Sequence, residues 1–70
     1  MRNKREYIIG IFEEAVVCVL KGEKFNDVEN FWLDMYIMKP QAFQKVLTIQ
    51  EEEILQVAES IEKKMKTGHR

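Results

Sequence analysis

The chain has few of the residues with which small proteins cross-link themselves. Its 70 residues include one cysteine, Cys18, and one histidine, His69. A disulfide needs two cysteines and a structural metal site needs several ligands, so neither can be built within the chain, and no cofactor is expected. An unpaired cysteine is typical of a reducing compartment, and we therefore expect a cytoplasmic protein.

Glycine, proline and serine are also scarce. The three glycines are isolated, which excludes a glycine-rich loop that cradles phosphate groups. No linker, repeat or low-complexity tract interrupts the sequence, so residues 1–70 are predicted to form a single helical domain with basic, frayed termini. His69 lies in the C-terminal tail without a nucleophile and an acid as partners. We therefore expect a protein that is not an enzyme.

Long hydrophobic runs are missing too. The most apolar stretch, residues 7–20, follows a basic N-terminus as in a signal peptide, but Glu13 and Glu14 lie in its middle. The stretch is also shorter than the ~20 residues that cross a bilayer as a helix. The sequence therefore predicts no membrane association.

Charge is distributed unevenly, although the net charge is only -1. The segment 6–62 carries all twelve acidic residues and only four lysines. The other basic residues are terminal: Arg2, Lys4, Arg5, Lys63, Lys64, Lys66 and Arg70. If the first and last helices are antiparallel, these charges gather at one end and could contact nucleic acid, which is the alternative function. The simpler interpretation is that they maintain solubility and complement a helix dipole.

The spacing of apolar residues predicts an all-α fold, a small bundle of three long or medium helices and one short helix. In the first segment the apolar residues follow the 3.6-residue period of a helix and break the alternation of a strand. Asn26 with Glu29, and Thr48 with Glu51, form capping-box patterns at helix starts. Pro40 is expected to begin a helix. The predicted helices cover about residues 4–21, 27–38, 40–47 and 49–66.

The second predicted helix is apolar around most of its circumference. We assign its buried face to one stripe, made of Val28, Phe31, Trp32, Met35 and Met38. The apolar residues then left facing outward are Leu33, Tyr36 and Ile37, to which Val17 of the first helix could add. Exposed apolar patches usually mark a partner site, so these four are the predicted partner-binding residues. The alternative is that the short third helix covers Leu33 and Ile37 within the monomer.

A chain of this length buries only about 60% of its surface on folding, so its core is marginal without oligomerisation. Together with the apolar patch, this predicts a small intracellular regulator or inhibitor that works by protein-protein interaction. The partner is either a second copy, in a two-fold homodimer, or a larger protein with a groove for the helix. A DNA-binding helix-turn-helix over residues 40–60 is disfavoured, because Glu51, Glu52 and Glu53 would face the phosphates.

Overall fold

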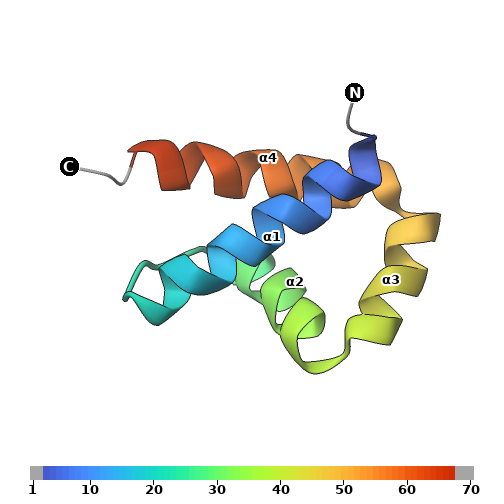
Figure 1. The fold of residues 1–70 in the computed structure, drawn as a ribbon, viewed down its shortest axis with the longest axis horizontal. Coiled ribbons are helices and arrows are strands. Elements are labelled where there is room, and N and C mark those ends of the chain that lie inside the picture. The colour runs from blue at the N-terminus through green and yellow to red at the C-terminus, as the bar shows by residue number, and fades with distance from the viewer. Residues whose placement is uncertain (1–2, 68–70) are drawn as a thin grey trace.

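The computed structural model describes residues 3–67, and these residues form four helices (Figure 1). The helices are α1 (Lys4–Leu20), α2 (Asp27–Met38), α3 (Pro40–Ile49) and α4 (Glu51–Thr67). Within the described range no residue is in a β-strand, and the predicted all-α bundle is confirmed. The frayed ends expected at the termini lie outside the described residues.

Two of the three local signals act as the sequence predicts. The Asn26 side chain accepts the Glu29 N–H at 2.8 Å, and the Glu29 carboxylate accepts the Asn26 N–H at 2.9 Å, which completes a capping box. Pro40 is the first residue of α3. The capping box predicted at Thr48 is wrong, because α3 continues through this position to Ile49. The Thr48 hydroxyl instead donates to the Gln44 carbonyl at 3.1 Å.

Helices α1 and α4 pack against each other and run in the same direction (Figure 1). In the first turn of each, the Lys4 ammonium contacts the Glu52 carboxylate. Further along, the Tyr7 hydroxyl donates to the Glu62 carboxylate. The antiparallel arrangement considered from the sequence is therefore wrong for this pair.

An aromatic cluster forms the centre of the core. It consists of Phe12 of α1, Tyr36 of α2 and Phe43 of α3. The ring centroid of Phe12 is 5.7 Å from that of Tyr36 and 5.1 Å from that of Phe43, and the centroids of Tyr36 and Phe43 are 5.4 Å apart. Tilted and edge-on pairs at such distances contribute about 0.5–1.5 kcal/mol each beyond the area they bury. Helix α4 adds a stripe of buried side chains, namely Ile54, Ala58, Ile61 and Met65. All four helices thus share one core.

The carboxylate of Glu29 connects the start of α2 to α4. It is only 1% exposed, and it accepts hydrogen bonds from the Ser60 hydroxyl at 2.6 Å and the Lys64 ammonium at 2.8 Å. Burial alone would raise the pKa of Glu29, but these two donors and the Asn26 N–H outweigh it and hold the pKa below its usual value. The side of α2 that carries Glu29 must therefore face α4.

Because Glu29 faces inward, α2 buries a different side from the one that its spacing predicts. Leu33 lies one turn after Glu29 and is 2% exposed, so its predicted outward position is wrong. Three residues predicted to face inward are instead more than half exposed: Val28, Phe31 and Met38. Trp32 lies between the two sides and is buried as predicted.

Candidate functional site

An exposed apolar stripe runs along the outer side of α2. It consists of Val28, Phe31, Met35 and Met38 and is called the α2 stripe below. Residues at this spacing share one face of a helix. Val28 is 59%, Phe31 56% and Met38 76% exposed, while Met35 is partly buried. The Phe31 ring stands edge-on to the Trp32 ring with the centroids 5.1 Å apart, so the core supports its position.

Charged residues of both signs border the α2 stripe. Asp27 is the first residue of α2, and Lys39 directly follows its last residue. Near the C-terminal end of the stripe is a shallow depression of about 200 Å³, lined by Phe31, Asp34, Met35, Met38 and Lys39. The stripe therefore has an acidic residue at one end, a second one beside its middle and a basic residue at the other end.

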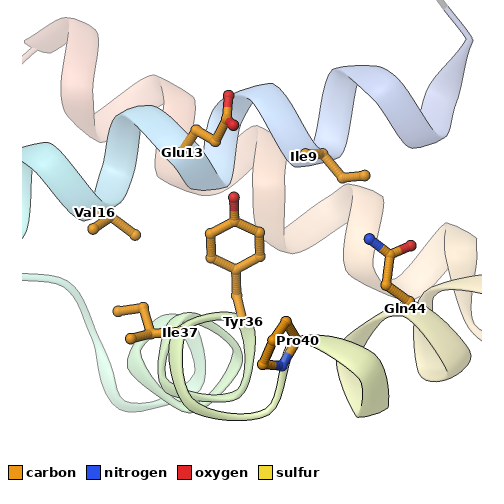
Figure 2. A pocket seen from close by; sticks show the side chains of 7 residues that line it. All are labelled: Ile9, Glu13, Val16, Tyr36, Ile37, Pro40 and Gln44. Carbon is orange, nitrogen blue, oxygen red and sulfur yellow. The ribbon is translucent and has the colours of Figure 1, made fainter.

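A second apolar surface is the groove between α1 and the corner where α2 meets α3 (Figure 2). The groove encloses about 440 Å³ and is lined by Ile9, Glu13, Val16, Tyr36, Ile37, Pro40 and Gln44. The Tyr36 side chain projects from α2 across the groove toward α1. Burial raises the pKa of Tyr36, and the negative charge of Glu13 raises it further. Its neutral hydroxyl can therefore donate a hydrogen bond in a groove whose other polar lining residues are Glu13 and Gln44.

The four predicted partner-binding residues occupy three different places. Tyr36 and Ile37 lie together in the groove, where Ile37 is 51% exposed. Leu33 belongs to the core. Val17 is 49% exposed on α1, close to Cys18 and not in the groove lining.

The terminal basic residues do not gather at one end of the described bundle. Because α1 and α4 are parallel, Lys4 and Arg5 lie near the start of α4, whereas the lysines at 63, 64 and 66 lie near its end. Three of the cations contact carboxylates, in the pairs Lys4–Glu52, Lys64–Glu29 at 2.8 Å and Lys66–Glu62 at 3.9 Å. The predicted residues Arg2 and Arg70 lie outside the described residues. Among the described residues, the basic side chains are therefore divided between the two ends of α4 and do not gather at one end as the alternative function supposes.

No family model, curated protein or solved structure matches this chain. In residues 3–67, no group of three or more histidine, cysteine, aspartate or glutamate side chains is placed to hold a metal ion. None of the four helices has the length and apolar character of a transmembrane helix.

The sequence does not predict that the α2 stripe is exposed. The spacing of Val28, Phe31 and Met38 identifies a shared face but not whether that face is inside. The capping box places Glu29 on the side of the helix opposite the stripe. That side faces inward only because the Glu29 carboxylate also contacts Ser60 and Lys64 of α4, which its spacing does not reveal.

Proposed function

We propose that this chain is a protein-protein interaction module whose binding surface is the α2 stripe. One observation carries the proposal: three large apolar side chains in a row along one helix, Val28, Phe31 and Met38, are each more than half exposed. Apolar side chains scattered singly over a surface need no explanation, but contiguous ones mark sites for a partner. Phenylalanine and methionine are also residue types enriched at interfaces.

Burial of the α2 stripe contributes part of the free energy that binding a partner requires. Burying a valine, phenylalanine or methionine side chain completely contributes about 1.5–3 kcal/mol. Because each of the three is already partly covered, a partner gains on the order of 1 kcal/mol from each. A helix with such a face is a standard element of helix-in-groove and helix-on-helix recognition. The role that fits a chain of this size is that of a regulator or inhibitor, which acts by occupying a surface of another chain.

Cys18 supports a cytoplasmic location within this proposal. Its thiol is partly buried against the core, and burial raises the pKa of the thiol, which keeps it protonated and unreactive. A structural thiol of this kind is compatible with a reducing compartment.

Site-specific photo-crosslinking in cells tests the proposal. A benzophenone amino acid replaces Phe31 in one variant and Ile49 in a control, because Ile49 is 80% exposed but lies on α3 outside the stripe. We expect a covalent adduct with a protein chain at position 31 and none at position 49. Equal labelling at both positions, or no adduct at position 31, would contradict the proposed function. The mass of the adduct shows whether the partner is a second copy or another protein.

A further inference from the structure

The order of residues along the α2 stripe is self-complementary about the middle of the helix. Leu33 lies at this middle position. Phe31 and Met35 are each two positions from it, and Val28 and Met38 are each five positions from it. Asp27 and Lys39 are each six positions from it. When two identical helices pack antiparallel about a two-fold axis, residues at equal distances on either side of the axis lie opposite each other. Centred at position 33, this pairing places apolar side chains opposite apolar ones and an acid opposite a base at both ends.

We infer that the partner of the α2 stripe is a second copy of this chain, packed antiparallel through α2 with the axis at position 33. The inference rests on the proposed function and adds the identity and geometry of the partner. In this arrangement Phe31 contacts Met35 of the second copy, and Val28 contacts Met38 of the second copy. Asp27 pairs with Lys39 of the second copy, and the symmetry makes every contact twice.

The charges favour the antiparallel arrangement over a parallel one. A parallel pair of α2 helices would place Asp27 beside its own copy and Lys39 beside its own copy. It would also align the two helix dipoles, whereas the antiparallel pair brings each positive N-terminus to a negative C-terminus. The 12 residues of α2 span about 18 Å, so the contact is small and belongs to the class of weak, reversible interfaces. We therefore expect a weak, readily reversible dimer.

Among the exposed charges of α2, Asp34 is the one that opposes this dimer. Asp34 lines the depression at the stripe and is one position from the two-fold axis. In the dimer, the two copies of Asp34 therefore lie on the same side of the helix pair, and their positions along the helix direction differ by about 3 Å. Like charges at neighbouring positions repel. Asp34→Asn is therefore expected to tighten the dimer about twofold or more at low salt, which sedimentation equilibrium measures. Weaker dimerisation of this variant would contradict the position of the axis.

Disulfide trapping tests the pairing directly. In a Cys18→Ser background, one protein carries Val28→Cys and another carries Met38→Cys; both positions are exposed, so the fold is retained. In the proposed dimer, the two copies of position 28 are about 15 Å apart along the helix direction, and so are the two copies of position 38. Position 28 of one copy instead lies opposite position 38 of the other. A disulfide requires Cα atoms closer than about 7 Å. Under mild oxidation we expect the mixture to form a mixed disulfide dimer, identified by intact mass, and each protein alone to form almost none.

The controls separate this inference from the proposed function. The protein with Ile49→Cys in the Cys18→Ser background measures the amount of disulfide that forms by random collision. When Phe31→Asp is added to both the Val28→Cys and the Met38→Cys protein, the yield of mixed disulfide should fall at least to that amount. Homodimers of Val28→Cys alone that form as readily as the mixed product would indicate a parallel pair and overturn the inference. A mixture that gives no more product than Ile49→Cys would also overturn it. In that case, a photo-adduct between position 31 and a different protein would still support the proposed function. The absence of any adduct would contradict both the proposed function and this inference.

Discussion

At the scale of single residues, Glu29 is the buried carboxylate that connects the start of α2 to α4. Its carboxylate accepts hydrogen bonds from the N–H of Asn26, the N-cap residue of α2, and from the side chains of Ser60 and Lys64 on α4. A buried carboxylate is stabilising only when its acceptor sites are filled, and here both oxygens have donors. The same contacts determine which side of α2 remains available to a partner.

We expect Glu29→Gln to destabilise the fold by about 1–3 kcal/mol at neutral pH, because the buried amide cannot replace the charge beside Lys64. The pKa of Glu29 is lowered in the folded chain, so the carboxylate stabilises above the unfolded value near 4.5 and this contribution is lost as pH falls through the folded pKa. Urea unfolding should therefore show a difference between the two proteins that shrinks below about pH 4.5. Glu14→Gln, at an exposed position of α1, is the matched control and should change stability little. A difference that grows toward acid pH would contradict the network.

At the scale of elements, the contact between Tyr7 and Glu62 connects α1 to α4. The hydrogen bond to Glu62, with a smaller effect of burial, raises the pKa of Tyr7 to about 12. For an acid whose pKa is raised on folding, the stabilisation is present below the unfolded value of 10 and lost as pH rises from 10 through 12. The parallel pairing of α1 and α4 is thus expected to weaken in this alkaline window.

A phenolate titration of Tyr36→Phe checks this, because Tyr7 is then the only tyrosine of the chain. We expect half-ionisation near pH 12, followed by ultraviolet absorbance, and near pH 10 after unfolding in urea. Glu62→Gln added to this variant should lower the midpoint toward 10. A midpoint near 10 in the folded Tyr36→Phe protein would mean that Tyr7 does not bond to Glu62.

The elements also show how far the sequence determines this fold. Asn26 and Pro40 predict the starts of α2 and α3, because caps and prolines act within a few residues of their own position. The rotation of α2 depends on Ser60 and Lys64, which are more than thirty positions from Glu29 and not identifiable as its partners from spacing. A helix that is apolar on two sides leaves that choice to tertiary contacts. The direction of α4 relative to α1 is likewise not encoded in local spacing.

At the scale of the whole molecule, the aromatic residues of the core differ in exposure from Phe31 of the α2 stripe. Phe12 is fully buried and contacts Tyr36 and Phe43, whereas Phe31 is 56% exposed. A domain of 70 residues has a total stability of only about 4–10 kcal/mol. Loss of a fully buried phenylalanine therefore removes much of it, and loss of a half-exposed one removes little.

We expect Phe12→Ala to lower the free energy of unfolding by about 3–5 kcal/mol and Phe31→Ala by about 1 kcal/mol or less, measured by urea unfolding at high dilution. At higher protein concentration, the unfolding midpoints of the natural protein and of Phe31→Ala should diverge. A second copy that binds only the folded chain raises the unfolding midpoint of the natural protein by mass action, and Phe31→Ala removes this increase. The midpoint of Phe31→Ala should therefore stay constant over a hundredfold range of concentration, while that of the natural chain rises. If both midpoints rise in parallel, Phe31 does not contribute to self-association.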